Sequence, residues 1–290
     1  MRKSIAHSGI IALMLAGILG SGCTEVNNKP APKDLSLALA GMAGSDGVSF
    51  EGSAALHRKG ETKPALSQYY GGKVENHNQL SLYTLLPDKG TSKTAATEGL
   101  QKLERTGATT HIHSAEKSYS SKLEKREGQW QELSATSGNN EDNPLPRLNP
   151  LLQLDQLKDV DKTVTEETGA ARGTRVLRIQ LTPEAARALL SRELEQEMNS
   201  LRPANSGIVT KNTHQTKANK AIEALWQKKN KEMKQQLAKA NVKAVYHLTV
   251  DKKQNLPRKL DWTRTVSYAD GKKPGDNESL VVQVNFYGYH

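Results

Sequence analysis

Residues 242–250, VKAVYHLTV, place an apolar side chain at every second position. This period, which runs from Val242 to Val250, is the pattern of a β-strand with one buried face. Residues 260–268, in which Arg264 interrupts the set, and residues 280–286 repeat the pattern, and the connections between the segments are short. Strands joined by short connections lie antiparallel to each other. The C-terminal end of the chain therefore predicts consecutive strands of one antiparallel sheet.

Further regions nearer the N-terminus also have the features of strands. Residues 48–56 alternate apolar and polar side chains, residues 69–85 predict a second long strand, and hairpins are predicted within 111–135 and 160–181. The sequence thus predicts roughly nine strands, most of them antiparallel. A single sheet of that size curls, so an open half-barrel is expected.

Helices are predicted where a capping side chain is followed by proline at the first helical position. Asn149 and Thr182 are both followed in this way. A shorter helix is expected with Asp34 as its N-cap and an apolar stripe of Leu35, Leu39 and Met42. Residues 216–240 predict a long helix with many lysines and a narrow apolar stripe, formed by Ala218, Ile222, Leu225, Met233 and Leu237. Such helices bury their stripes most simply on a concave sheet face. The predicted fold is α+β, a large curved antiparallel sheet (a half-barrel) with two or three helices on its concave face, over residues 34–290.

The N-terminus has the features of an export signal. Arg2 and Lys3 form a short positive region, residues 10–19 form an apolar segment, and the small residues Ser21 and Gly22 suit a cleavage site. The apolar segment is too short to cross a bilayer core of about 30 Å as a stable helix. We therefore expect a signal that is removed and a mature protein outside the cytoplasm.

Cys23, the only cysteine, directly follows these small residues, and the arrangement resembles the lipobox of bacterial lipoproteins. The lipobox usually has Leu, Val or Ile three residues before the cysteine; here Gly20 stands there and Leu19 one place earlier. The resemblance implies that residues 1–22 are a lipoprotein signal peptide and that Cys23 becomes a lipid-bearing first residue. Residues 24–33 would then tether the protein to the extracytoplasmic face of the cell membrane. The alternative is an ordinary signal peptide with a chance cysteine.

Composition limits the classes of function. Only 36% of the residues are hydrophobic and 4% are aromatic, so the core is modest for 290 residues. The formal net charge of +10 suggests acidic partners, which for an exported protein are anionic lipid headgroups and wall polymers. Nucleic-acid binding is not expected. The lysine-rich helix at 216–240 either lies on an anionic membrane or presents a solvated basic face, and we expect the solvated face.

Few residue patterns indicate chemistry. His111 and His113 would share one face of a strand, as a metal-binding pair does, but no further ligand is close in sequence, so we expect solvated histidines. Glu166 and Glu167 are strand neighbours that would face opposite sides and could not easily share a substrate. The sequence has no Gly-x-Ser-x-Gly, His-Glu-x-x-His or phosphate-loop motif. We therefore predict no catalytic residues, no metal and no cofactor.

The order of these segments resembles bacterial lipoproteins with the LolA/LolB/LppX-like half-barrel fold, particularly those of Gram-positive type. The resemblance covers most of residues 34–290. It is carried by this layout and by YYGGKVENHNQLSLY (69–83), VDKKQNLPRKLDW (250–262) and the terminal VVQVNFYGYH. It implies an apolar cavity between sheet and helices that holds acyl chains, or a packed interior that serves as a binding scaffold.

The leading hypothesis is a non-enzymatic, membrane-anchored lipoprotein that binds a lipid or another hydrophobic ligand. Its candidate ligand-binding residues are apolar and aromatic side chains of the predicted strands and helices: Tyr70, Leu82, Leu190, Leu194 and Trp226. The alternative is a scaffold with the same fold and a filled core, which binds or regulates an envelope protein in sporulation, germination or envelope stress. An envelope hydrolase would need a cluster of catalytic side chains that no motif indicates.

Overall fold

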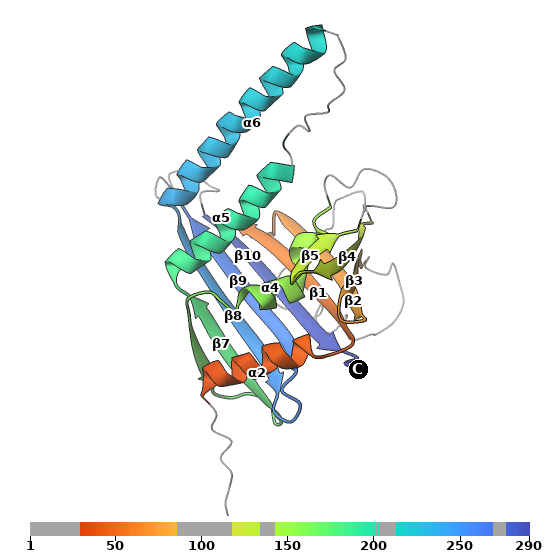
Figure 1. The fold of residues 1–290 in the computed structure, drawn as a ribbon. Coiled ribbons are helices and arrows are strands. Elements are labelled where there is room, and N and C mark those ends of the chain that lie inside the picture. Colours follow the sequence, from red (N-terminus) through yellow and green to blue (C-terminus); the bar gives the residue numbers. More distant parts are fainter. Residues whose placement is uncertain (1–29, 86–117, 134–142, 201, 203–212, 269–276) are drawn as a thin grey trace, which may run out of the picture.

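The computed structural model of the chain describes residues 30–85, 118–133, 143–200, 202, 213–268 and 277–290. The signal segment, Cys23, most of the tether and the predicted histidine pair lie outside the described residues. Ten strands within the described ranges form one antiparallel sheet (Figure 1). Their order across the sheet is β5-β4-β3-β2-β1-β10-β9-β8-β7-β6.

The elements follow one another in this order. The first half of the chain contains α2 (Ala31–Ala43), β1 (Val48–Arg58), β2 (Leu66–Glu75), β3 (Gln79–Thr84), β4 (Ser120–Arg126) and β5 (Gln129–Glu132). The middle contains the 3-10 helix η2 (Leu145–Leu148), α4 (Pro150–Gln156), β6 (Lys162–Glu167), β7 (Thr174–Leu181), α5 (Pro183–Ser200) and α6 (Thr213–Lys239). The chain ends with β8 (Asn241–Asp251), β9 (Pro257–Ser267) and β10 (Asn277–Tyr287).

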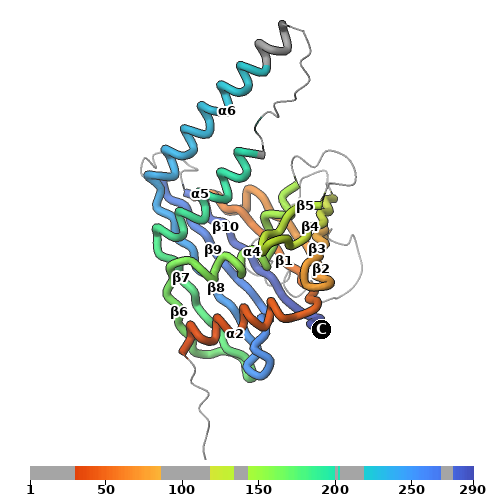
Figure 2. Tube along the Cα trace, in the orientation of Figure 1, coloured from red at the N-terminus to blue at the C-terminus, as the bar shows by residue number. Residues whose placement is uncertain are grey.

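The sheet is curved and open, and α2, α4 and α5 lie across one of its faces (Figure 1). This confirms the predicted class, an α+β half-barrel with helices on its concave face. The tube in Figure 2 follows the same path, with β6 at one edge of the sheet. Helix α6 differs from the others because it projects past the end of the sheet (Figure 1).

The strand nearest the N-terminus pairs with the strand nearest the C-terminus. In the register of β1 and β10, Phe50 lies opposite Phe286 and Ala54 opposite Val282. This pairing joins the half of the sheet built by β1–β5 to the half built by β6–β10. The sheet is therefore continuous across the chain, and residues far apart in sequence share its concave face.

The prediction of one long strand over 69–85 is wrong. The segment is a hairpin in which Val74 of β2 pairs with Leu80 of β3. The turn between them uses Asn76 and His77 at φ of 53° and 62°, a region in which Asn and His are enriched. The apolar period continues in phase through the turn, because both partners of the pair face the core. Periodicity alone therefore could not indicate that the chain reverses direction here. The sheet has ten strands, one more than the roughly nine predicted.

The core fills the concave face. Phe50 and Tyr70 are fully buried, and their rings pack edge to face with centroids 6.5 Å apart. Gly72 lies between Phe50 and Leu82 on neighbouring strands. A Cβ atom at Gly72 would lie 2.4 Å from the Phe50 ring and 2.9 Å from Leu82 Cδ2. This glycine is thus required by close packing, not by an unusual backbone angle.

The predicted helix starts are confirmed at α4 and α5, but the start predicted at Asp34 is wrong, because α2 begins at Ala31 and Asp34 lies buried within it. The Asn149 side chain accepts a hydrogen bond from the amide of Leu151 at 3.0 Å, which caps α4. The Thr182 hydroxyl accepts one from the amide of Ala185 at 3.3 Å at the start of α5. Within the described residues, no helix is both long enough and apolar enough to span a bilayer.

Candidate functional site

A pocket of about 430 Å³ lies between α2 and the strand β6 at the edge of the sheet. Leu35 and Leu39 of α2 form one wall, and Leu157 and Val164 form the other. The volume falls within the roughly 300–1,000 Å³ that is usual for ligand sites in proteins. Its walls are mainly aliphatic, so the pocket suits an apolar chain.

The position of α2 over the sheet depends on the spacing of its apolar residues and on one glycine. Leu35 and Leu39 are four residues apart and both are buried, so they share the face that packs on the core. A Cβ atom at Gly41 would lie 3.0 Å from the carbonyl oxygen of Asn255, in the turn between β8 and β9. The small residue lets α2 approach this turn closely. Helix α2 thus forms a fixed wall of the pocket.

Two lysines stand among the pocket-lining residues, and their surroundings differ. Lys158 Nζ donates to Asp155 Oδ1 at 2.7 Å, and the same carboxylate accepts from Lys125 at 2.6 Å. Lys162 Nζ donates only to main-chain oxygens, those of Lys158 at 3.1 Å and Val160 at 3.0 Å. Among the described residues, Lys162 has no acidic partner. The pocket therefore combines apolar walls with an uncompensated positive charge.

The sequence-predicted ligand residues do not line this pocket. Tyr70 and Leu82 lie on neighbouring strands in the buried core, with exposures of 0% and 1%. The Tyr70 hydroxyl has no hydrogen-bond partner in the part of the chain that the structure describes, and burial raises the pKa of its phenol. Leu190 of α5 is buried in the same core, and Leu194 packs against it. The structure brings these four residues into one hydrophobic cluster.

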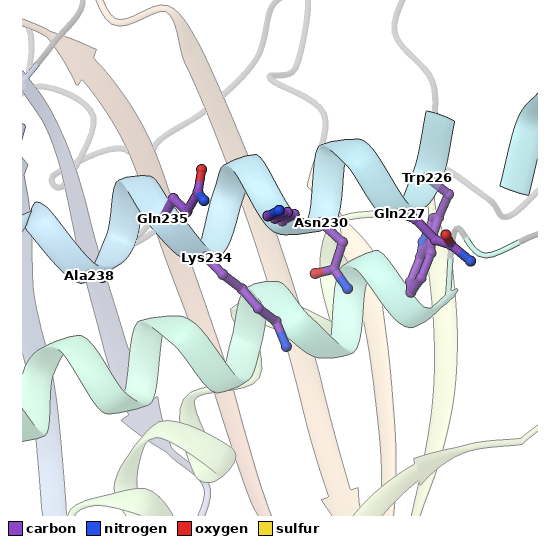
Figure 3. A pocket seen from close by; sticks show the side chains of 7 residues that line it. Trp226, Gln227, Asn230, Lys234, Gln235 and Ala238 are labelled. Carbon is purple, nitrogen blue, oxygen red and sulfur yellow. The ribbon is translucent and has the colours of Figure 1, made fainter. Parts of the chain in front are cut away.

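Trp226 lies apart from that cluster, on α6. Its indole Nε1 donates to the carbonyl oxygen of Met198 on α5 at 2.6 Å, and the Arg202 guanidinium lies 4.8 Å from the ring centroid. A second pocket, of about 410 Å³, lies along this part of α6. Figure 3 shows Trp226, Asn230 and Lys234 directed towards α5, while Gln235 points away. Trp226 thus serves the contact between helices α5 and α6.

Other residues considered for chemistry are separated in the fold. Glu166 lies across from Leu177 in the sheet register, and Glu167 lies on the opposite face, 3.5 Å from His247. In the described ranges, no group of three His, Cys, Asp or Glu side chains is placed to hold a metal ion. His111 and His113 are outside those ranges. The α2–β6 pocket is built from aliphatic walls and a cation.

Sequence reasoning missed this pocket although it recognised its parts. Leu35 and Leu39 stood out as an apolar stripe, and Val164 belonged to a predicted hairpin. Their proximity depends on the sheet order, which brings β6 beside α2. No local pattern carries that information. The one available signal was the position of Lys162 at the start of an edge strand, next to an apolar segment.

The sequence matches no protein-family model and none of the curated proteins with which it was compared. A solved structure of lipovitellin that concerns its lipid–protein interactions aligns with 84% of this chain at 9% identity and a TM-score of 0.31. This chain spans only 25% of lipovitellin. A LolA superfamily protein from Nitrosomonas europaea aligns with 90% of this chain and 93% of its own length, at 8% identity and a TM-score of 0.22.

A DUF1329 family protein from Desulfovibrio piger also aligns with 90% of this chain and 93% of its own length, at 10% identity and a TM-score of 0.25. These identities and TM-scores assign the chain to no family. The arguments that follow therefore depend on the pocket, the buried contacts and the charges of this chain itself.

Proposed function

We propose that the chain is an exported lipoprotein that binds an acidic amphiphile and does not transform it. The observation that carries the ligand proposal is the α2–β6 pocket, whose aliphatic walls adjoin Lys162, a lysine without an acidic partner in the described residues. An amphiphile has the complementary chemistry, because its chain matches the walls and its head group matches the cation.

Binding would draw on both parts of the ligand. Each methylene group that leaves water for the pocket contributes about 0.8 kcal/mol. A carboxylate or phosphate head group would accept a charge-assisted hydrogen bond from Lys162, which is stronger than a bond between neutral groups. The main-chain oxygens that Lys162 now contacts carry no full charge, so an anion would be a better partner. A neutral lipid would lose that part of the affinity.

The N-terminal sequence supports the proposed location. Residues 1–22 have the order of an export signal, and Cys23 stands where a lipoprotein carries its lipid. Diacylated cysteine would hold the protein firmly, whereas a single acyl chain gives only marginal binding. The short segment 24–33 would keep α2, and with it the pocket, close to the extracytoplasmic face of the cell membrane. That surface is also the source of acidic amphiphiles.

A second candidate function is a regulatory scaffold for an envelope protein. The supporting observation is that Tyr70, Leu82 and Leu190, proposed as ligand contacts, are all buried in one continuous cluster. If the concave core stays closed, the fold would act through its surface. Two results together would favour this function over the first. The protein would take up no amphiphile, and in native membranes it would cross-link to one stoichiometric partner.

The ligand proposal can be tested with a matched pair of probes. A fluorescent long-chain fatty acid and its methyl ester differ only in the charge of the head group. We expect the acid to bind more tightly, and Lys162→Gln to lower its affinity about tenfold while leaving the ester unchanged. Equal affinities of the wild type for both probes would show that Lys162 does not recognise the ligand.

A steric variant tests the pocket itself. Ala40 is exposed on α2 and lines the pocket, so Ala40→Trp fills the space without altering the core. Ala224 is an exposed helical alanine on α6, remote from the pocket, and Ala224→Trp is the control. We expect only Ala40→Trp to abolish binding of the fatty acid. Binding that survives Ala40→Trp would move the ligand site elsewhere, including to the concave core around Tyr70.

A further inference from the structure

Among the described residues, helix α6 contacts the rest of the protein on one side. Trp226 donates its indole hydrogen to Met198 of α5, and Lys234 pairs with Glu195 of α5 at 3.3 Å. Nearer its C-terminal end, Leu237 enters the core and is 4% exposed. The opposite side of the helix, over the half that projects past the sheet in Figure 1, faces away from α5. This free side needs a separate explanation.

Two apolar side chains in this half of the helix are exposed: Leu225 lies on the free side, and Ile222, one turn before Trp226, lies at its edge. Ile222 and Leu225 are 51% and 56% exposed, although the sequence pattern placed both in the stripe that packs. Lys228 and Lys229 follow Leu225 by three and four residues, so they lie on the same side of the helix. We refer to Ile222, Leu225, Lys228 and Lys229 as the distal patch. A helix that carries both lysines and exposed aliphatic side chains has the composition of an interfacial helix.

The charge of α6 is strongly positive and only partly neutralised. Between residues 219 and 239 the helix carries six lysines and two glutamates, Glu223 and Glu232. Lys229 pairs with Glu232 at 2.9 Å, and Lys234 pairs with Glu195. Among the described residues, the other four lysines form no salt bridge, although Lys228 is close enough to Glu232 to help lower the pKa of that carboxyl: Lys220, Lys228, Lys231 and Lys239. The helix therefore presents an excess of cations to its surroundings.

We propose that the distal patch binds the surface of an anionic lipid bilayer. Lysines near such a surface are attracted to acidic headgroups, and the aliphatic side chains of an interfacial helix enter the boundary between headgroups and acyl chains. The exposed side chains of Ile222 and Leu225 favour a membrane over a polyanion. A phosphate backbone or an acidic peptide would contact the lysines but leave both aliphatic side chains in water. The patch is separate from the α2–β6 pocket and does not require lipidation of Cys23.

Flotation with lipid vesicles tests this proposal. All described elements lie within residues 30–290, so a protein that begins at residue 24 keeps the whole described fold and lacks the signal and the cysteine. The probes are vesicles of phosphatidylcholine alone and vesicles of equal parts phosphatidylcholine and phosphatidylglycerol. We expect flotation only with the mixed vesicles, and less of it at high salt, since salt screens the attraction. Equal flotation with both kinds of vesicle, or none, would overturn the proposal.

A pair of charge reversals tests the orientation of the helix. Lys228 belongs to the distal patch, whereas Lys231 lines the pocket along α6 together with Trp226 and Lys234, and neither lysine forms a salt bridge within the described residues. Each lysine near an anionic surface contributes about fivefold to binding, so Lys228→Glu should weaken vesicle affinity by about 25-fold. Lys231→Glu should have a clearly smaller effect. Equal losses would indicate attraction without orientation and would overturn the proposal.

The aliphatic contribution is tested in the same way. The double variant Ile222→Ser with Leu225→Ser should reduce flotation, whereas Leu66→Ser should not, although Leu66 is 59% exposed on β2. Unchanged flotation of the double variant would identify a polyanion-binding surface and contradict membrane insertion. Circular dichroism checks that each variant is folded. Lys162→Gln and Ala40→Trp should leave flotation unchanged, which separates this proposal from the ligand pocket.

Discussion

Asp34 on α2 and Arg175 on β7 form an ion pair in which the side chains are only 1% and 3% exposed. Arg175 Nη1 donates to Asp34 Oδ2, while Asp34 Oδ1 and Arg175 Nε find no partner in the described part of the chain. The pair joins the helix that forms one wall of the pocket to the sheet beneath it. A buried pair of this kind is expensive to break, because the remaining charge is left without a partner.

The first prediction concerns that pair. Asp34→Ala should lower the free energy of unfolding by about 3–5 kcal/mol, because it leaves the Arg175 guanidinium buried and unpaired. Replacing both residues, with Asp34→Leu and Arg175→Met, should recover much of the loss. Urea unfolding of the single and double variants measures the coupling. The control is Glu75→Ala, which removes a half-exposed pair with Lys73 and should cost at most about 1 kcal/mol. Similar losses in both single variants would contradict the role of burial.

The second prediction concerns close packing at Gly72. Gly72→Ala should destabilise the fold by about 1–3 kcal/mol, because the new Cβ would overlap the Phe50 ring and force the core to shift. The control is Gly44→Ala, at the C-terminal end of α2, where a Cβ would lie 3.4 Å from the Ala40 carbonyl oxygen and φ is −89°. Thermal unfolding should separate the two variants by several degrees. Equal melting temperatures would show that the strands around Gly72 are less tightly packed.

These packing features show which information the sequence contains. The two-residue period of β8, β9 and β10 follows from burial of one sheet face, so the antiparallel sheet could be predicted locally. The turn at Asn76 could not, because the apolar positions of β2 and β3 remain in phase across it. The α2–β6 pocket required the strand order, which depends on pairing between distant segments such as β1 and β10.

The candidate sites also depend on information that a local sequence pattern does not contain. The sequence suggested Tyr70, Leu82 and Leu190 as ligand contacts, and the structure buries all three in one hydrophobic cluster, but burial alone does not identify a ligand site. Ile222 and Leu225 have the spacing of packed residues, but α6 extends beyond the elements that could cover them. A sequence pattern reports which face of a helix is apolar. Whether that face meets the core depends on where the helix leaves the sheet.

The third prediction is a loss of stability at alkaline pH. Burial raises the pKa of the Tyr246 phenol to about 12, from about 10 in the unfolded chain, and its ring stacks on Trp262. The folded protein therefore keeps this proton at pH values where the unfolded chain loses it. The stabilisation is complete below pH 10 and is lost as the pH rises towards 12, by about 2–3 kcal/mol in total.

Tyr246→Phe provides the comparison for that measurement. The variant has no phenol to ionise, so its free energy of unfolding should fall less between pH 10 and pH 12 than that of the wild type. Urea unfolding across this range gives both curves. Parallel curves would mean that Tyr246 ionises equally in the folded and unfolded states. The Tyr287 phenol, whose pKa burial and its hydrogen bond to Glu51 raise to about 12, adds to the slope in both proteins.

The last prediction concerns the attachment of α6. Trp226→Ala removes the hydrogen bond to Met198 and the stacking of Arg202. Together these losses should lower the free energy of local unfolding of the projecting half of α6 by about 1–3 kcal/mol. Hydrogen exchange of the amides in residues 219–232 should accelerate by one to two orders of magnitude, about tenfold for each 1.4 kcal/mol. Amides of β8 should not change, because Leu237 keeps the other end of the helix in the core. The matched control is Leu225→Ala, on the free side of the helix, which should leave exchange unaltered. Faster exchange in Leu225→Ala would mean that this side chain is packed in solution, and the distal patch would then be a buried surface.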